Sequence, residues 1–302
     1  MTASDDVRKV MAGIPILAGS PGPIERLGGL TNRVFRVGEM CLRIPGDGTE
    51  EYIDRANEDV AAREAARAGV SPEVLYSDPA TGLMVTRFID GTCTMSPENF
   101  RNIQGATARA GKAFRKLHES SAVFPFRFDL FAMIDDYLGV LAGKDMALPD
   151  GYHDVVAEAG TVRAALAEHP AALAACHCDP LCENFLDTGE RMWIVDWEYS
   201  GMNDPMWDLG DLSVEGEFTP DQDAELLHAY FGRAPTAAEH GRVVIYKAMC
   251  DLLWTLWGLI QLANDNPADD FRAYADGRFA RCKTLMADPA FEAHLEAIRA
   301  GS

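Results

Sequence analysis

The sequence is poor in positive charge. It carries 27 lysines and arginines against 47 aspartates and glutamates, which leaves a formal net charge of −20. A nucleic-acid-binding surface needs clustered basic residues to neutralise phosphates, and so does a protein that binds an anionic membrane. We therefore expect neither a nucleic-acid nor a membrane partner. An acidic protein suits a cationic substrate, although acidic surfaces also serve solubility alone.

The chain also lacks long apolar runs, internal repeats and low-complexity segments. No stretch of eighteen residues is uninterruptedly apolar, and the N-terminus has no basic segment followed by an apolar core. We therefore expect a soluble, cytoplasmic protein. Hydrophobic residues make up 48% of the 302 residues, which is enough for a large core and for two packed lobes. Oligomeric state is not predicted by any of these features.

Cysteine usage does not indicate disulfides. The seven cysteines are odd in number and accompany no secretion signal, which favours reduced thiols. Cys176 and Cys178 flank His177, and Cys182 follows, but there is no second ligand pair at a spacing typical of zinc sites. We expect small buried thiols. The alternative, a Cys/His metal protein, would require stoichiometric zinc in the purified chain.

Short strands bounded by turns dominate the first ninety residues. After a short leading helix, strand patterns occur at 24–27, 34–38, 40–44, 73–76 and 83–88. Residues 49–69 interrupt them with a helical pattern that has Thr49 as its N-cap and Gly69 as its terminator. The glycine-rich turn at 28–32 could bring backbone amides and the Thr31 hydroxyl close to phosphates, although Gly-Gly more often simply makes a hairpin.

The remainder of the chain is mostly helical in pattern. Residues 88–91 form a linker, and helices are expected at 97–118, 129–143, 151–168, from 201–210 onward, 220–231, 235–263, 269–286 and 289–300. A strand-rich first part followed by a helical second part predicts an α+β fold.

Polar residues at fixed spacing surround one apolar segment in the middle of the chain. His177-x-Asp179-x4-Asn184 is followed by Asp196 at the end of the apolar run 192–195. One carboxylate can orient a hydroxyl, and an amide with a second carboxylate offers the hard oxygen donors that magnesium prefers. Phosphoryl transfer needs these parts, because its catalysis is mostly positioning and charge neutralisation. The alternative is an ordinary polar loop, against which the flanking apolar residues predict a strand pair holding both loops.

This Asp…Asn…Asp constellation resembles the catalytic and metal-binding loops of the protein-kinase-like small-molecule phosphotransferases. More narrowly, it is similar to the bacterial branch of the choline/ethanolamine kinase family, which has the aminoglycoside phosphotransferase-like fold. The resemblance implies two lobes, a small antiparallel N-terminal lobe at 1–90 that binds nucleotide and a larger, mostly α-helical lobe at 91–302 that carries catalysis and substrate binding.

The activity implied by the resemblance is ATP- and Mg²⁺-dependent phosphorylation of the hydroxyl of a small amino alcohol, choline first. Alternatives within the fold are kinases of ethanolamine, of another methylated amino alcohol, of thiamine or of an aminoglycoside. A non-catalytic nucleotide-binding module is a further alternative, against which the intact set of Asp179, Asn184 and Asp196 argues.

The resemblance also assigns roles to single residues. Asp179 would orient the substrate hydroxyl or act as the base, and Asn184 and Asp196 would bind magnesium. Arg43 would face the phosphates and pair with Glu58, for which the alternative is a solvated helix face. Other nucleotide-binding candidates are Gly29, Thr31, Asn32 and Ile89. Structural roles without chemistry are expected for His118, His177 and Asp208.

Aromatic residues near the C-terminus bear on the substrate. Trp254 and Trp257 lie three residues apart, on one face of the predicted helix. In general such a pair is more often core than a cage for a cation. The order Trp-x2-Trp…Gln…Tyr-Ala, which ends at Tyr274, is however similar to the C-terminal signature of choline kinases, where aromatic faces hold a trimethylammonium group.

Carrying the resemblance over adds Tyr199 to the aromatic set and Glu215 as a source of negative charge near the cationic head. Two departures accompany it. Cys178 and Asp211 each stand where this branch usually has Asn, and Asp211 adds a charge on the substrate side. Neither change removes a catalytic part, but Asp211 leaves open which amine fits.

Overall fold

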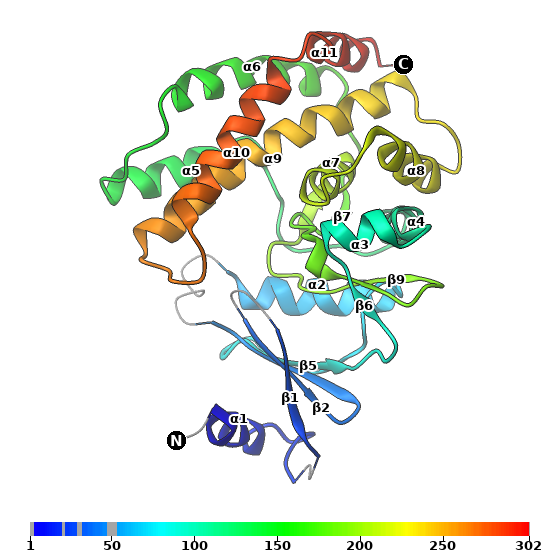
Figure 1. Cartoon of the computed structure of the whole chain (residues 1–302), viewed down its shortest axis with the longest axis vertical. Helices are drawn as coiled ribbons and strands as arrows, with labels where there is room; N and C mark the ends of the chain where they lie inside the picture. The colour runs from blue at the N-terminus through cyan, green and yellow to red at the C-terminus, as the bar shows by residue number, and fades with distance from the viewer. Residues whose placement is uncertain (1–2, 20–21, 29–31, 47–52, 302) are drawn as a thin grey trace.

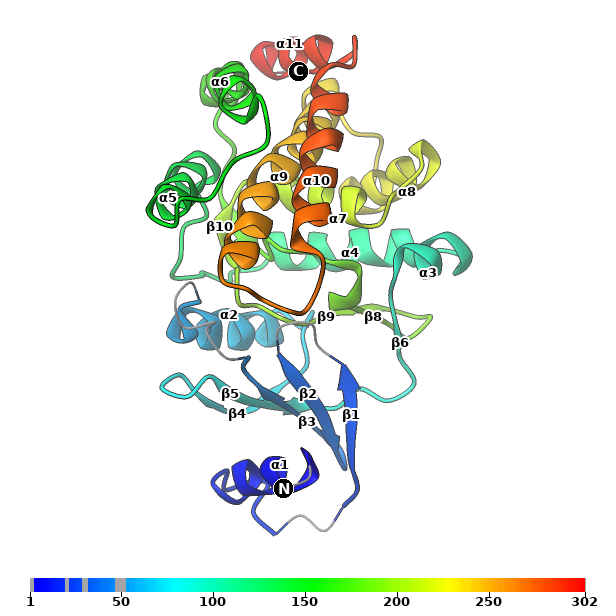
Figure 2. The same cartoon turned by 60° about the vertical axis from the view of Figure 1, so that its left-hand side comes forward.

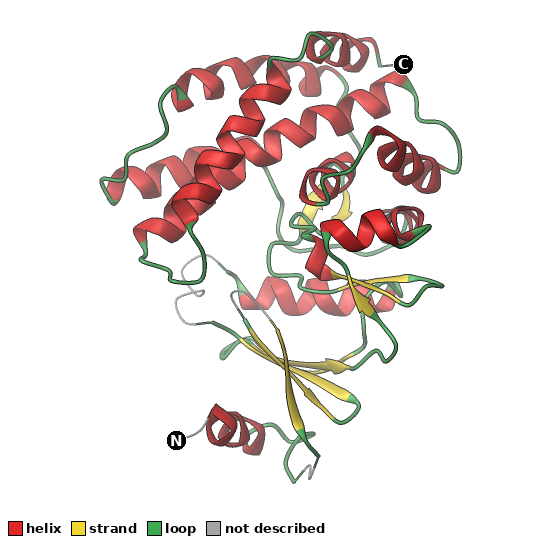
Figure 3. Ribbon diagram, in the orientation of Figure 1, coloured by secondary structure: helices red, strands yellow, loops and turns green. Residues whose placement is uncertain are grey.

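The computed structural model describes residues 3–19, 22–28, 32–46 and 53–301. Gly29, Thr31 and Thr49, to which the sequence assigned roles, lie outside these ranges. The described residues form an antiparallel sheet at one end of the molecule and a large assembly of helices at the other (Figures 1 and 3). This arrangement confirms the α+β, two-lobed, protein-kinase-like fold.

The N-terminal sheet has five strands in the order β1-β2-β3-β5-β4, and each neighbouring pair is antiparallel. The strands are β1 (Ile24–Gly28), β2 (Arg33–Val37), β3 (Met40–Ile44), β4 (Val74–Asp78) and β5 (Leu83–Arg87). Helix α1 (Ala3–Ala12) lies below the sheet in Figure 1 and shares a small apolar core with it. Alternation along β2 and β3 turns Phe35, Val37 and Leu42 into that core.

Helix α2 (Arg55–Arg67) lies between the sheet and the helical part (Figure 2). It begins six residues later than the sequence predicted. Its N-cap is Asp54, whose carboxylate accepts hydrogen bonds from the backbone N–H groups of Ala56 and Asn57. This start places Glu58 in the first turn, with only 3% of its surface exposed.

The predicted helix at 97–118 is wrong as a single element. The structure has α3 (Pro97–Asn102) and α4 (Ala106–His118), because Ile103 is extended and Gly105 adopts a left-handed conformation with φ 74°. Periodicity continued across the break, since Ile103 and Ala106 are apolar. The other helices are α5 (Leu130–Gly143), α6 (Tyr152–Glu168), α7 (Met206–Glu215), α8 (Pro220–Phe231), α9 (Ala237–Ala263), α10 (Phe271–Met286) and α11 (Phe291–Ala300).

The described residues also form two small sheets that are separate from the N-terminal sheet. One has the order β6-β8-β9, formed by β6 (Cys93–Thr94), β8 (Phe185–Asp187) and β9 (Met192–Ile194). The antiparallel β8–β9 pair is the strand pair that the sequence predicted. The other pairs β7 (Ala174–Cys176) with β10 (Gly201–Asn203). Residues 201–203 were expected to start a helix, but they pair with β7 and the helix begins at Met206.

Helix α9 is the central support of the helical part. It packs against α5, α7, α10 and α11. It is long and apolar enough to cross a membrane by length and composition, but 83% of its most apolar window is buried against the rest of the protein. We therefore assign it as a core helix, and this position fixes the direction in which its two tryptophans point.

Candidate active site

The loop between β7 and β8 carries Asp179, and backbone hydrogen bonds shape it. The carbonyl oxygen of Asp179 accepts from the backbone N–H of Leu181 (2.9 Å) and from the side-chain Nδ2 of Asn184 (3.1 Å). The carbonyl of Asn184 in turn accepts from the N–H of Val195 (2.9 Å), next to Asp196. One chain of bonds therefore ties together the three residues that the sequence grouped by spacing alone.

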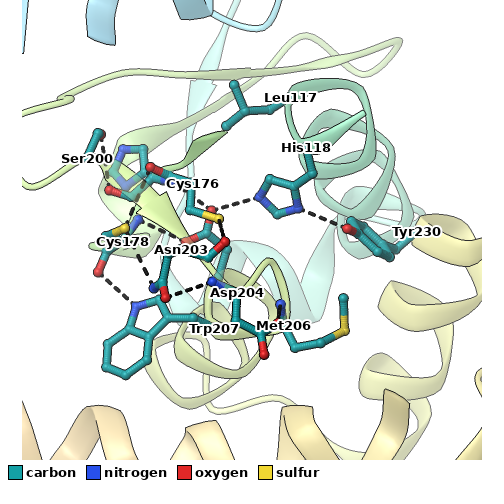
Figure 4. Close-up of polar contacts among 12 residues, drawn as sticks. Leu117, His118, Cys176, Cys178, Ser200, Asn203, Asp204, Met206, Trp207 and Tyr230 are labelled. Atoms are coloured by element: carbon teal, nitrogen blue, oxygen red, sulfur yellow. Dashed lines mark hydrogen bonds and ion pairs between the residues drawn. The ribbon is translucent and has the colours of Figure 1, made fainter. Parts of the chain in front are cut away.

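Asp208 supports this loop through hydrogen bonds to its backbone. Its two carboxylate oxygens accept from the backbone N–H groups of His177 (2.7 Å) and Cys178 (2.8 Å), and one of them also contacts His118 Nε2 (3.0 Å). His118 Nδ1 lies 3.0 Å from the Tyr230 hydroxyl, so the support continues into α8 (Figure 4). The buried Asp208 therefore holds the catalytic loop, which matches the structural role expected for it.

The backbone of Cys178 is left-handed, with φ 68°. Asn adopts this conformation more readily than other L-residues, and a buried cysteine has no such preference. The hydrogen bond from its backbone N–H to Asp208 holds Cys178 there, and the indole Nε1 of Trp207 donates to its carbonyl oxygen (3.0 Å).

His177 is a structural residue. Its ring is fully buried, and Nε2 lies 2.9 Å from the carbonyl oxygen of Val195. Burial lowers its pKa, although the nearby Asp208 carboxylate raises it. Its ring therefore joins the segment before Asp196 to the loop of Asp179, since Nδ1 also accepts from the Asp179 backbone N–H (3.4 Å).

A Cys/His metal site is not supported. His118, Cys176 and Asp208 do lie close enough to share an ion. However, burial raises the pKa of the Cys176 thiol well above its usual value, so the thiolate that zinc requires is disfavoured. The Asp208 oxygens are already bonded to two backbone N–H groups and to His118. Cys176, Cys178 and Cys182 are all buried, as expected for small buried thiols.

A second cluster joins the two lobes through carboxylates and arginines. Arg43 on β3 makes a two-point ion pair with Glu58 on α2, as the sequence predicted, with Arg43 Nη2 2.8 Å from Glu58 Oε2. Arg43 also lies 3.8 Å from Asp196 and 3.7 Å from Glu198. Arg55 contacts Glu58 (2.9 Å) and Glu198 (3.0 Å). Charges from β3, α2 and the segment after β9 therefore meet at one place.

The carboxylates of this cluster fit a divalent cation. Oxygens of Glu58, Asp196 and Glu198 lie within 4.8 Å of one another. Asp196 Oδ1 is buried and has no hydrogen-bond partner, which is costly unless a ligand satisfies it. Burial, together with the Asp196 carboxylate, raises the pKa of Glu198 to about 7. Glu58 and Glu198 are paired with arginines, but the carboxylate oxygens of this cluster are the hard donors that magnesium prefers, and one of them, Asp196 Oδ1, has no partner.

Four other residues were predicted to bind the nucleotide, and two of them lie within the described part of the chain. Asn32, only 3% exposed, donates from Nδ2 to Glu198 Oε2 (3.3 Å) and thus borders the carboxylate cluster. Ile89 lies in the linker between β5 and β6, where its carbonyl oxygen accepts from the Thr92 hydroxyl (3.3 Å). Gly29 and Thr31 lie outside the described residues, so their role stays a prediction.

The aromatic residues predicted to bind the substrate lie together. The rings of Tyr199 and Trp254 meet edge-to-face at 5.6 Å, and those of Trp257 and Tyr274 at 5.7 Å. Trp257 Nε1 donates to the Tyr199 hydroxyl (2.9 Å), which joins the two pairs. Trp254 is only 3% exposed and is packed as core, whereas Trp257, Tyr199 and Tyr274 are partly exposed. The three partly exposed rings are thus the better candidates for contact with a ligand.

Negative charge collects between this aromatic group and the catalytic loop. Asp211 is fully buried on α7, and its Oδ2 accepts from Trp254 Nε1 (3.2 Å). Burial raises its pKa well above the usual value, and the carboxylates of Glu215 and Asp179 raise it further. The pKa of Asp179 is likewise raised, first by burial and then by Glu215. The three carboxylates therefore repel one another and favour a bound cation.

Glu215, expected to supply negative charge near the cationic head, is paired with an arginine. Arg278 Nη1 lies 2.6 Å from Glu215 Oε1 and 3.2 Å from Asp251, and the guanidinium covers the Tyr274 ring at 4.6 Å from its centroid. Asp251 is also bound by Arg281 (2.6 Å). Glu215 and Asp251 are thus both paired. Among the described residues near the rings, the carboxyl groups without an ion pair are those of Asp179 and Asp211.

Sequence reasoning missed three residues of this region. Glu198 follows Asp196 by two positions in Asp-Trp-Glu, a signal that could have suggested a further oxygen ligand. Arg278 follows Tyr274 by four, so one helical turn places both on the same face of α10. Arg55 carried no sequence signal, because its contacts with Glu198 depend on two segments 143 residues apart.

Comparison with known proteins agrees with this geometry. A model of the phosphotransferase enzyme family matches residues 24–240, which is well over half of the chain. The chain belongs to the phosphotransferase enzyme family. A solved choline/ethanolamine kinase family protein from Mesorhizobium loti is 73% identical, covers 99% of this chain and 100% of its own length, and superposes with a TM-score of 0.94. This places the chain in the choline/ethanolamine kinase branch, as the sequence motifs indicated.

The more distant relatives include both choline kinases and ethanolamine kinases. The choline kinase LicA from Streptococcus pneumoniae is 23% identical with a TM-score of 0.77, over 94% of this chain and 98% of its own. Another LicA structure, in complex with AMP, is 24% identical with a TM-score of 0.74, over 93% and 97%. Mouse ethanolamine kinase 1 is 25% identical over 83% of this chain and 80% of its own. The enzyme is therefore a phosphotransferase with an alcohol acceptor, as expected.

Proposed function

We propose that the enzyme transfers the γ-phosphoryl group of ATP to the hydroxyl of a small amino alcohol in its cationic form, with choline as the first candidate. The observation that carries this proposal is the position of Asp211, buried between the loop of Asp179 and the rings of Tyr199 and Trp254. This position supports a site in which Asp179 orients the hydroxyl and Asp211 lies on the side of the cationic group.

The nucleotide end of the site is proposed around the cluster that joins the lobes. Arg43, held by Glu58, supplies positive charge for the phosphates, and Asn32 borders the same cluster through Glu198. Ile89, in the linker between the lobes, is the further candidate for nucleotide contact. The AMP held by a LicA structure supports nucleotide binding by this fold. Asn184 and Asp196, joined by Glu198, are the residues that would hold Mg²⁺, which when bound neutralises charge on the transferring phosphates.

The reacting end is proposed at Asp179. Its carboxylate accepts the hydrogen bond of the substrate hydroxyl, orients the oxygen toward the γ-phosphorus and receives the proton as the new O–P bond forms. The bond that breaks joins the γ-phosphorus to the bridging oxygen of ADP. The pKa of Asp179 is raised by burial, which gives this carboxylate the affinity for a proton that the role requires.

The preference for choline rests on the aromatic rings. A quaternary ammonium offers no N–H group, so its binding depends on ring faces and diffuse negative charge. Trp257, Tyr199 and Tyr274 supply partly exposed rings next to Trp254, and Asp211 supplies charge. Ethanolamine depends more on carboxylates that accept hydrogen bonds and is the second candidate.

The test is ATP consumption by the purified chain with Mg²⁺ against choline, ethanolamine, thiamine and an aminoglycoside. We expect turnover with choline. Trp257→Leu, which keeps apolar bulk but loses most of the aromatic face, should lower kcat/KM for choline about tenfold, the loss of roughly one cation–π contact, with a smaller effect on the KM for ATP. Trp193→Leu is a matched control, because this tryptophan on β9 stacks on Arg191, away from the aromatic group.

Two outcomes would contradict the proposal. Unchanged choline kinetics in Trp257→Leu would mean that the tryptophan pair is core. ATP binding without turnover of any alcohol on the panel would instead favour a non-catalytic nucleotide-binding module.

A further inference from the structure

Asp211 has an oxygen that nothing in the described protein satisfies. The side chain is fully buried on α7, and Oδ2 accepts from Trp254 Nε1 at 3.2 Å. Oδ1 is buried as well and has no hydrogen-bond partner among the described residues. A carboxylate oxygen withdrawn from water without a partner costs more than an ordinary lost hydrogen bond. Its persistence here points to a ligand that supplies the missing donor.

The neighbouring cation does not meet this need. Arg278 interacts electrostatically with Asp211, but its Nη1 is engaged by Glu215 and Asp251, and its guanidinium lies over Tyr274. Glu215 and Asp251 are therefore both paired with arginine, whereas Asp211 keeps one bare oxygen. Among the described carboxyl groups around the rings, Asp179 and Asp211 are the ones that make no ion pair.

The surroundings of Asp211 indicate where the missing donor comes from. The indole that holds Oδ2 packs edge-to-face on Tyr199, and Tyr199 is joined to Trp257 through their hydrogen bond. The Asp179 carboxylate acts on Asp211 electrostatically. A group bound against these rings with its hydroxyl at Asp179 would therefore carry its nitrogen next to Asp211.

We propose that Asp211 accepts a hydrogen bond from an N–H group of the substrate amine and thereby admits amino alcohols whose nitrogen still carries a hydrogen. The proposal rests on the function proposed above and adds the residue that decides how the site treats methylation. Ethanolamine and its N-methyl and N,N-dimethyl derivatives are cations with at least one N–H donor. Choline has the same charge and a similar shape but none.

Replacing Asp211 by Asn separates the hydrogen bond from the shape of the side chain. Asn has a single oxygen, which Trp254 Nε1 would occupy, so its NH₂ group would face the substrate. For every amine that carries an N–H group, the NH₂ group of the Asn side chain and the N–H group of the substrate would then face each other, and both are donors. Choline would lose only an electrostatic attraction, because its methyl groups made no hydrogen bond to Asp211.

The experiment is a specificity constant for each alcohol of the series ethanolamine, N-methylethanolamine, N,N-dimethylethanolamine and choline, in the wild type and in Asp211→Asn. We expect the ratio of kcat/KM for N,N-dimethylethanolamine to that for choline to fall about tenfold in the variant, the size of a charge-assisted hydrogen bond. The effect of Asp211→Asn on kcat/KM should be similar for the three alcohols that carry an N–H group. It should differ in one step between N,N-dimethylethanolamine and choline, because only there does the final N–H group disappear.

The control is Asp223→Asn, which removes a carboxylate on α8 that binds Ser213 (2.5 Å) and Lys247, outside the aromatic group. It should leave the ratio unchanged. Should Asp211→Asn not fold, Trp254→Phe removes the donor that holds Oδ2 and should lower the same ratio by a smaller factor.

An equal loss for all four alcohols in Asp211→Asn would overturn the proposal, since Asp211 would then act through charge alone. A gradual trend across the series would also overturn it, because size and not the N–H group would decide. Failure of the proposed function looks different: the wild type would then phosphorylate none of the four alcohols.

Discussion

At the scale of single residues, two left-handed backbone positions define the site. Cys178 and Asp196 both have φ 68°, on either side of the β8–β9 pair. Such conformations cost free energy in non-glycine residues and persist where surrounding bonds enforce them. Asp208 enforces the first through two backbone N–H groups. The second turns the carboxylate of Asp196 toward Arg43 (3.8 Å) and the metal-fitting cluster.

The sharpest prediction at this scale concerns Asp179. Asp179→Asn should lower kcat by at least a thousandfold, because the amide cannot receive the hydroxyl proton, while the Kd for ATP stays within a few-fold. Steady-state kinetics and a nucleotide titration on the same preparation measure both quantities. Asp187→Asn serves as a control, since that carboxylate binds Arg109 (2.5 Å) away from the site. Turnover near that of the wild type would remove Asp179 from the reaction.

At the scale of elements, glycines set how closely helices approach. Gly111 on α4 faces α8, and a Cβ built there would lie 2.6 Å from the carbonyl oxygen of Leu226. Because α4 ends at His118, which contacts Asp208, this packing bears on the support of the catalytic loop. A backbone oxygen on a helix cannot move aside as a flexible side chain can.

Gly111→Ala should therefore destabilise the protein by about 2 kcal/mol, a typical cost of overpacking. Gly139→Ala on α5 is the matched control: a Cβ there meets nothing within 4 Å, so the change should stabilise by roughly 0.5–1 kcal/mol through helix propensity. Urea unfolding of both variants measures the two free energies. A neutral Gly111→Ala would show that α4 and α8 can separate without cost.

At the scale of the whole molecule, acidic charge opposes the folded state. The formal net charge is −20, and buried carboxyl groups near the rings hold their protons more tightly than usual. The pKa of Asp211 is raised above its ordinary value of 3.8, by burial first and by Glu215 next. Such a group contributes its full stability below the unfolded-state pKa. That contribution is lost as the pH rises toward the folded-state pKa.

The substrate-free protein should accordingly lose stability as the pH rises from 5 to 8, and Asp211→Asn should lose less. The difference in free energy of unfolding, variant minus wild type, should therefore grow with pH. Urea unfolding at pH 5, 6, 7 and 8 measures it, with Asp223→Asn expected to run parallel to the wild type. Parallel curves for Asp211→Asn and the wild type would mean that Asp211 does not change its protonation in this range.

The sequence by itself determined the order of the elements and the reacting set. Turn residues and apolar periodicity are local, so they located the strands of the first lobe and most helices within a few residues. Asp179, Asn184 and Asp196 lie together in the structure because Asn184 and Asp196 flank one short strand pair and Asn184 donates a hydrogen bond to the Asp179 carbonyl. The same local signals failed at 97–118, where a left-handed Gly105 divides a continuous apolar pattern.

Only the tertiary structure decided which charges are paired. Glu215 was expected to supply negative charge near the cationic head, and the fold pairs it with Arg278 from α10. Asp211 was noted only as a departure from Asn, yet one of its buried carboxylate oxygens has no hydrogen-bond partner among the described residues. Glu198 and Arg55 meet across 143 residues. Pairing of this kind depends on the distance between elements that no local pattern relates, and a charge acquires its role from the partner that folding brings to it.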